Sequence, residues 1–190
     1  MGLLDRFAPN GDALDYGCGK LRYALRVADL ARRLTVVDSE IQLSRVQVIN
    51  GNLTTIRGFV ESHWNHVTVL NADEFRGCLE RFDFALCANV LSTIPRDAIR
   101  KEVINRIAGR LKRRGVCLFV CQYTNSYFGR QMGAPDVTKY RDGFIKGTKE
   151  NASFYGVIKP EALTRLVHSA GMTVVERWRH EQSGYVVARR

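Results

Sequence analysis

The chain contains no hydrophobic run long enough to cross a bilayer, and it contains no internal repeat or low-complexity tract. Its amino terminus lacks the charged start, apolar middle and small-residue cleavage site of a secretory signal. These absences argue against a helical membrane protein and a repeat protein. We therefore expect a cytoplasmic protein without membrane contact.

Paired-cysteine motifs and zinc-binding motifs are also missing. The cysteines are odd in number and form no CxxC pair, and the four histidines show no zinc-ligand spacing. We expect reduced thiols and no metal site. The five cysteines are Cys18, Cys78, Cys87, Cys117 and Cys121.

Acidic residues are scarce relative to basic ones. Asp and Glu number 19 against 29 Lys and Arg, which gives a formal net charge of +10. Such a surface attracts polyanions in a salt-dependent way, although a basic run is usually a solvated face. No zinc finger or basic zipper is present, so nucleic acid is a candidate partner and any recognition must come from other elements.

The length and pattern fit one α/β domain over residues 1–190. Hydrophobic residues make up 45% of the chain, enough for a full core. Short apolar runs alternate with segments of helical spacing, for example Val27, Leu30 and Leu34. This alternation predicts a parallel sheet covered by helices on both faces, with ligands at the carboxyl ends of the strands.

A glycine-rich turn is the most informative motif. The segment ALDYGCGKLRYA places Asp15 at the end of an apolar run and Gly17 and Gly19 in the turn that follows. Glycines allow a backbone to turn tightly and approach a ligand. The third glycine of the dinucleotide fingerprint is replaced by Arg22, which disfavours a nicotinamide-dependent oxidoreductase.

An acid two residues before GCG resembles motif I of class I S-adenosylmethionine-dependent methyltransferases. The resemblance covers about residues 12–121 and 155–188. It implies a three-layer Rossmann-like sandwich with a mostly parallel seven-stranded sheet and an antiparallel last strand. It also implies that Asp15, Gly17, Cys18 and Gly19 bind the cofactor S-adenosylmethionine. Leu21 stands where the family often has a further glycine.

The second and third strand ends extend this resemblance. LTVVDSE ends in Asp38 and Ser39, and Asp38 follows Gly19 by 19 residues. That spacing suits a carboxylate that accepts both ribose hydroxyls. VTVLNADEF resembles the family's third strand, which implies that Asp73, with Glu74 beside it, accepts from the adenine amino group and that Phe75 stacks on the ring. Each acid taken alone is more often a helix cap or a solvated strand end.

The fourth and fifth strands also match. FDFALCANVLSTIP, residues 82–95, resembles the family's fourth-strand pattern and implies that Cys87, Ala88 and Asn89 lie at the methionine portion of the cofactor. Thr93 replaces the family's common histidine, so no general base is carried over. The segments that match the fifth strand and the closing strand pair are LKRRGVCLFV, HSAGMTVVERW and SGYVVARR.

Residues 122–158 form a connection too long for an ordinary loop, and we expect them to be a substrate lid. Aromatic rings alternate there with Lys and Arg, a pattern that suits single-stranded or flipped nucleotides. A small apolar cluster with a solvated basic face is an equal alternative. The aromatic residues are Tyr123, Tyr127, Phe128, Tyr140, Phe144, Phe154 and Tyr155.

The function expected from these features is methyl transfer from S-adenosylmethionine. The reaction depends mainly on alignment of the acceptor and exclusion of water. We expect Asn89, Gln122 and Tyr123 nearest the reacting centre as orienting groups, with the Tyr123 ring facing the sulfonium. The acceptor, a nucleic acid or a small molecule, and the oligomeric state stay open. A non-catalytic cofactor-binding subunit that acts as a nucleic-acid or protein partner is the alternative.

Overall fold

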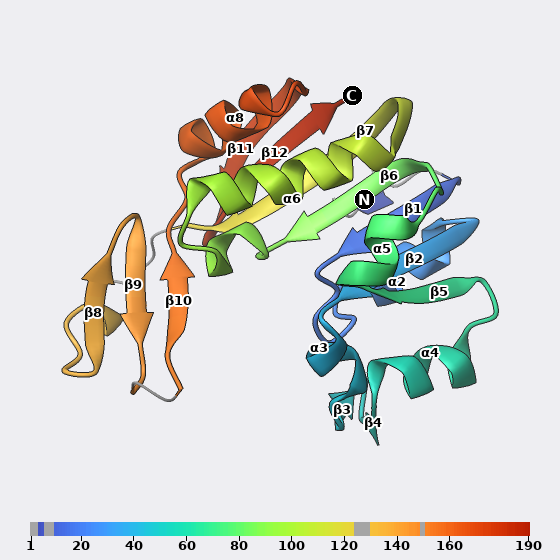
Figure 1. Ribbon diagram of the computed structural model, residues 1–190, viewed down its shortest axis with the longest axis horizontal. Coiled ribbons are helices and arrows are strands. Elements are labelled where there is room, and N and C mark those ends of the chain that lie inside the picture. The colour runs from blue at the N-terminus through green and yellow to red at the C-terminus, as the bar shows by residue number, and fades with distance from the viewer. Residues whose placement is uncertain (1–3, 6–9, 124–129, 149–150) are drawn as a thin grey trace. The chain divides into compact units, whose positions relative to one another are not determined.

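The computed structural model describes residues 4–5, 10–123, 130–148 and 151–190 (Figure 1). Its main sheet has seven strands in the order β11-β12-β7-β6-β1-β2-β5. β1 pairs in parallel with β2 and β6, and β2 pairs in parallel with β5, whereas β11 and β12 are antiparallel. The predicted Rossmann-like fold class is therefore confirmed. The strands are β1 (Asp12–Tyr16), β2 (Arg33–Asp38), β5 (Val67–Asn71), β6 (Phe82–Ala88), β7 (Leu111–Gln122), β11 (Thr173–His180) and β12 (Ser183–Arg189).

The chain divides into two compact units. The first comprises Met1–Leu86 and Gly109–Cys117, and the second comprises Cys87–Ala108 and Leu118–Arg190. A single domain over residues 1–190 stays a prediction. In the described ranges, no helix combines the length and the apolar character needed to span a membrane.

Two helices of the first unit, α3 (Glu40–Ser44) and α4 (Ile56–His63), begin at side-chain caps that the sequence supplies. Ser39 accepts from the backbone N–H of Gln42, and Thr55 accepts from that of Gly58. These contacts satisfy amide groups that have no partner within the helix. α2 and α5 contact β2, and α4 contacts β5. The helices are α2 (Ala24–Leu30), α3 (Glu40–Ser44), α4 (Ile56–His63) and α5 (Ala72–Gly77).

Between α3 and α4 the chain forms a hairpin, β3 (Gln47–Ile49) and β4 (Asn52–Thr54), that the sequence did not predict. The pattern of residues 40–65 predicts one or two helices broken near Asn50 and Gly51. The break is confirmed, because both residues have positive φ, 45° and 84°. Such a pair is typical of a two-residue hairpin turn. Strands of three residues are too short to show a clear alternation.

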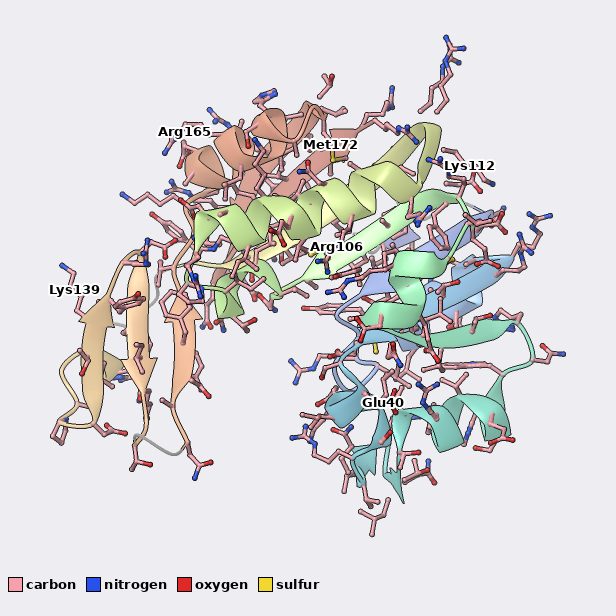
Figure 2. All side chains as sticks on the ribbon, in the orientation of Figure 1. Glu40, Arg106, Lys112, Lys139, Arg165 and Met172 are labelled. Carbon is pink, nitrogen blue, oxygen red and sulfur yellow. The ribbon has the colours of Figure 1, made fainter. Side chains whose placement is uncertain are left out.

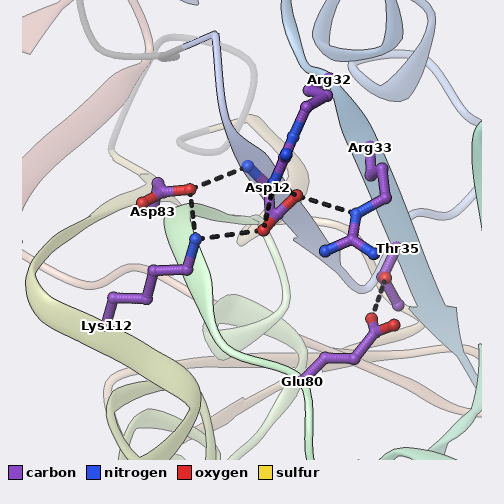
Figure 3. Close-up of polar contacts among 7 residues, drawn as sticks. All are labelled: Asp12, Arg32, Arg33, Thr35, Glu80, Asp83 and Lys112. Carbon is purple, nitrogen blue, oxygen red and sulfur yellow. Dashed lines mark hydrogen bonds and ion pairs between the residues drawn. The ribbon is translucent and has the colours of Figure 1, made fainter.

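A charge network around the buried Asp12 anchors the amino end of the first unit's sheet (Figure 3). Asp12 accepts from Arg32 at 3.0 Å, from Arg33 at 2.9 Å and from Lys112 at 3.1 Å. Lys112 also donates to Asp83 at 2.8 Å. The hydrogen bond from Arg33, with those from Lys112 and Arg32, holds the pKa of Asp12 well below its usual range. This network ties β1, β2, β6 and β7 together far from the glycine turn.

The second unit contains η1 (Leu91–Thr93), α6 (Asp97–Arg110) and α8 (Pro160–Ser169). Pro160 starts α8 with its fixed φ, and Gly171 follows the helix with a φ of 75°. α8 lies against β11 and β12 (Figure 1). Its Leu163 and Val167 are fully buried.

The expected lid segment, residues 122–158, contains a separate three-stranded sheet. Its strands are β8 (Val137–Tyr140), β9 (Gly143–Lys146) and β10 (Ser153–Gly156), in the order β10-β9-β8. β10 contacts η1. Phe144 is buried and stacks on Tyr155 at a centroid distance of 5.3 Å, so this sheet has an apolar cluster of its own. Its role as a lid stays a prediction, and Tyr127 and Phe128 lie outside the described residues.

Candidate cofactor site

The glycine turn follows β1 directly. Gly17 has a φ of 82° and donates its N–H to the Val37 carbonyl at 2.7 Å, and Cys18 donates to the same oxygen at 3.1 Å. Gly19 has a φ of 55°, and a Cβ placed on it would meet no atom within 4 Å. The turn is therefore fixed to β2 on one side and open to a ligand on the other.

Asp38 holds this turn from the end of β2. Its Oδ2 accepts from the Gly19 N–H at 2.9 Å, and its Oδ1 accepts from the Ser39 N–H at 2.8 Å. A carboxylate oxygen has two lone pairs, so each oxygen keeps one acceptor position. The structure thus brings Asp38 and the turn together and leaves two neighbouring acceptor positions. That number matches the two hydroxyls of a ribose, and ribose binding itself stays a prediction.

Gln42 is a residue of this site that the sequence analysis missed. Its Nε2 donates to the Gly19 carbonyl at 2.8 Å, from the first turn of α3. Gln42 and Asp38 therefore bind the two backbone groups of the same glycine. The sequence signal that could have identified Gln42 is its position three residues after the helix cap Ser39.

Asp15 is a buried carboxylate beneath the turn. It is 1% exposed and pairs with Val36 of β2 and Leu86 of β6 in the sheet register. Its Oδ2 has no hydrogen-bond partner among the described residues. Burial, followed by the charge of Asp38, raises the pKa of Asp15 to about 7. A cation bound nearby would favour the ionised carboxylate.

Cys18 is a packing residue in this structure. It is 6% exposed, and burial raises the pKa of its thiol well above the usual range, with a further contribution from the charges of Asp15 and Asp38. A thiol in that state is a poor nucleophile. Cofactor binding by Cys18 stays a prediction.

The end of β5 begins a helix that the sequence analysis did not predict. Asn71 caps α5 by accepting from the N–H groups of Asp73 and Glu74, and the Glu74 carboxylate accepts from the Asn71 N–H at 2.6 Å. Asn71 is the register partner of Asp38, so Asp73 and Glu74 follow a strand end beside that acid. The Asp73 side chain is 83% exposed and pairs with Arg76 at 2.6 Å. Adenine recognition by Asp73 and Glu74 stays a prediction.

Phe75 occupies the core instead of a ligand-binding surface. Its side chain is 2% exposed, and its ring lies 5.5 Å from that of Tyr16 and 6.4 Å from that of Phe82. The prediction that this ring stacks on adenine does not fit its position and needs correction. The capping box starts α5 at Ala72 and turns Phe75 inward, toward the sheet.

The remaining predicted residues belong to the second unit. Cys87 is fully buried and Ala88 is 8% exposed. Asn89 has a φ of 61° and donates its N–H to the Val120 carbonyl at 2.7 Å, and its buried Oδ1 has no partner among the described residues. An orphaned buried acceptor costs about 1–3 kcal/mol, so this oxygen is available to a donor from a ligand.

Gln122 is the last residue of β7 and Tyr123 follows it, both in the second unit. The Gln122 N–H donates to the hydroxyl of Ser92 at 3.1 Å, and Ser92, which is 3% exposed, is a second residue that the sequence analysis missed. The Tyr123 N–H donates to the Gln182 carbonyl at 2.7 Å. The guanidinium of Arg179 lies 4.3 Å from the centre of the Tyr123 ring. One face of the ring already holds a cation, so the predicted contact with a sulfonium is restricted to the other face.

Comparison with known proteins relates the chain to one protein by sequence and to solved structures by fold. No protein-family model matches the chain. The uncharacterized protein YmfD of Escherichia coli strain K12 is 35% identical over 178 residues, which cover 93% of this chain and 79% of YmfD.

Two solved structures illustrate the similarity in fold. An S-adenosylmethionine-dependent methyltransferase from Clostridium acetobutylicum ATCC 824 has a TM-score of 0.68 at 13% identity, over 95% of this chain and 84% of the other. The 1,6-didemethyltoxoflavin-N1-methyltransferase of Burkholderia thailandensis, solved with its acceptor and S-adenosylhomocysteine, has a TM-score of 0.66 at 18% identity, over 99% and 74%. The chain belongs to the same family as YmfD, and its fold is the Rossmann-like fold of class I S-adenosylmethionine-dependent methyltransferases.

Proposed function

We propose that this protein is a methyltransferase that binds S-adenosylmethionine at the glycine turn and Asp38. The observation that carries the proposal is the 2.9 Å hydrogen bond from the Gly19 N–H to Asp38. Open space lies next to the same glycine, on the side where a Cβ would point. The adenosyl group brings two ribose hydroxyls, and Asp38 keeps two acceptor positions for them. The cofactor also carries positive charge, which the buried carboxylate of Asp15 would favour.

The comparisons support this proposal at the level of fold. The B. thailandensis enzyme contains S-adenosylhomocysteine, the product that remains after methyl transfer. Its acceptor is a small molecule, and a small-molecule acceptor is therefore one candidate for this chain. A nucleic acid is the other, because the net charge of +10 favours polyanions. We place the reaction in the cytoplasm, where the five cysteines would be reduced.

Methyl transfer is an in-line displacement. The acceptor atom forms a bond to the methyl carbon as the bond from that carbon to sulfur breaks, and the acceptor's proton leaves to water or a base. Alignment of the reactants supplies about 7–11 kcal/mol of barrier lowering. In this chain, Asn89 would orient the acceptor through its unpartnered Oδ1, and Gln122 and Tyr123 would complete that orientation.

A non-catalytic cofactor-binding subunit is the second candidate function. Two side chains near the predicted reacting centre already have structural partners. The Thr93 hydroxyl donates to the Val90 carbonyl at 2.8 Å, and the Tyr123 ring holds Arg179. These contacts favour a binding role, because they leave fewer groups available for acid or base chemistry.

Calorimetric titration with S-adenosylmethionine and S-adenosylhomocysteine tests the binding step. We expect binding to the parent protein and at least tenfold weaker binding to Asp38→Ala. The matched control is Asp29→Ala, since the Asp29 side chain is 66% exposed on α2. Asp38→Asn keeps the shape of the side chain and separates loss of charge from collapse of the turn. Absence of binding heat with folded parent protein would refute the proposal.

Transfer of tritium from labelled cofactor tests catalysis. The acceptors to be offered are DNA, RNA and a small-molecule panel. Label in one acceptor class identifies it, and binding without transfer to any of them supports the non-catalytic subunit instead.

A further inference from the structure

A second candidate binding site lies within the second unit. A cavity of about 420 Å³ is lined by the start of α6, the turn between β8 and β9 and one side of α8. Its volume falls within the range of roughly 300–1,000 Å³ that is typical of small-molecule sites. Pro95, Ile158 and Leu166 supply apolar surface. Five charged residues also line the cavity: Asp97, Arg100, Arg141, Asp142 and Arg165.

The two acidic residues of this cavity both pair with one buried arginine. Arg100 is 2% exposed and binds Asp142 through two hydrogen bonds of 2.5 and 3.0 Å. It also donates to Asp97 at 2.9 Å and to the Leu91 carbonyl at 3.1 Å. Because Arg100 is fully engaged, it anchors the wall of the cavity and is not available to a ligand.

The other two arginines of the lining lie outside this ion-pair network, and Arg141 makes a hydrogen bond to the Tyr140 side chain. Arg165 projects from α8, and no ion pair joins it to an acid among the described residues (Figure 2). Arg141 is exposed and lies over the ring of Tyr140 at 5.5 Å. The cavity therefore has three guanidinium groups against two carboxylates, a net charge of +1, and Arg141 and Arg165 are the two guanidinium groups with no ion pair to an acid among the described residues. Guanidinium groups bind phosphate oxygens through paired hydrogen bonds.

We propose that this cavity binds a phosphate ester, with the phosphate between Arg141 and Arg165 and the organic part against the apolar surface of Ile158 and Leu166. The phosphate could belong to a free nucleotide or to the backbone of a nucleic acid, since both present the same group. This proposal does not depend on methyl transfer, because all of its residues lie in the second unit and none belongs to the cofactor site.

Calorimetric titration at low salt with three probes tests the proposal. The probes are inorganic phosphate, adenosine 5′-monophosphate and a single-stranded oligonucleotide. The test variant combines Arg141→Gln and Arg165→Gln, and the control is Arg189→Gln, an exposed arginine on β12 outside the cavity. Both altered side chains are exposed, so we expect the variants to fold, and circular dichroism checks this.

We expect the mononucleotide to bind the parent and the control, and to bind the double variant at least tenfold more weakly. Competition between the mononucleotide and the oligonucleotide for the same arginines would assign the phosphate to nucleic acid. Binding of the mononucleotide without the oligonucleotide would assign it to a small phosphate ester. The proposal is overturned if no probe binds at millimolar concentration, or if the control weakens binding as much as the double variant, which would indicate net charge alone.

Discussion

Replacing Asp15 with asparagine is expected to make the free energy of unfolding less sensitive to pH. The Asp15 carboxyl is 1% exposed, and burial followed by the charge of Asp38 raises its pKa to about 7 from an ordinary value of 3.8. The folded protein therefore holds this proton more tightly than the unfolded chain does. Between about pH 4 and pH 7, stability falls by about 1.4 kcal/mol for each pH unit.

The magnitude follows from the same two pKa values. Below pH 4 the carboxyl is protonated in both states and contributes no pH dependence. Above pH 7 it is ionised in both states, and the folded state bears a cost of about 4 kcal/mol. Asparagine cannot ionise, so the Asp15→Asn variant lacks this loss. Its amide can leave a buried donor unpaired at a cost of about 1–3 kcal/mol, but that cost is the same at every pH.

Urea denaturation followed by circular dichroism at pH 5 and pH 8 measures the difference. Between these two pH values, we expect the free energy of unfolding to fall by about 3 kcal/mol more in the parent than in Asp15→Asn. Asp29→Asn is the control, because the Asp29 side chain is 66% exposed and its removal should leave the pH dependence of the parent unchanged. If the free energies of unfolding of the parent and Asp15→Asn changed with pH in parallel, the pKa of Asp15 would be an ordinary one and the argument would be refuted.

Three further substitutions test the packing and the ion networks. Phe75→Ala should lower the free energy of unfolding by about 3–5 kcal/mol in urea denaturation, because the ring is 2% exposed, and a loss below 1 kcal/mol would show that the ring is not in the core. Asp12→Asn should cost about 1–3 kcal/mol at pH 7, since the buried side chain loses its charge-assisted hydrogen bonds from Arg32 and Arg33. Because the pKa of Asp12 is low in the folded protein, its contribution to the free energy of unfolding is present above pH 4 and lost in more acid solution. The difference in stability between the parent and Asp12→Asn should therefore shrink toward pH 3, and a constant difference would contradict this reasoning. Arg100→Gln should lower the melting temperature by several degrees, because Asp142 loses two hydrogen bonds, whereas Arg189→Gln should leave it unchanged.

The geometry of the glycine turn was predictable from the sequence because it depends on neighbours in the sheet. Parallel strands that are adjacent end at the same edge, so an acid at the end of β2 must lie beside a turn at the end of β1. The hydrogen bond between Gly19 and Asp38 follows from that arrangement. The spacing of 19 residues is the length of one connecting helix and one strand, which makes it informative without any ligand.

The position of Phe75 was not predictable from the same pattern. An aromatic residue just after a strand end can face a ligand or the core, and the choice depends on where the next helix begins. The reciprocal hydrogen bonds of Asn71 and Glu74 start α5 at once and rotate Phe75 toward Tyr16. The signal was present as an Asn followed three residues later by a Glu, which is a capping-box spacing.

Side chains expected to orient an acceptor are the hardest to assign from sequence, and Tyr123 shows why. Its ring is contacted by Arg179, a residue 56 positions away whose approach depends on how β11 and β12 pair. Periodicity carries no information about such a contact. Asn89 differs, because its buried Oδ1 has no partner among the described residues and its backbone is held at a φ of 61°. A strained residue with an unpaired acceptor is costly unless a ligand uses it, so Asn89 is the stronger of the two candidates.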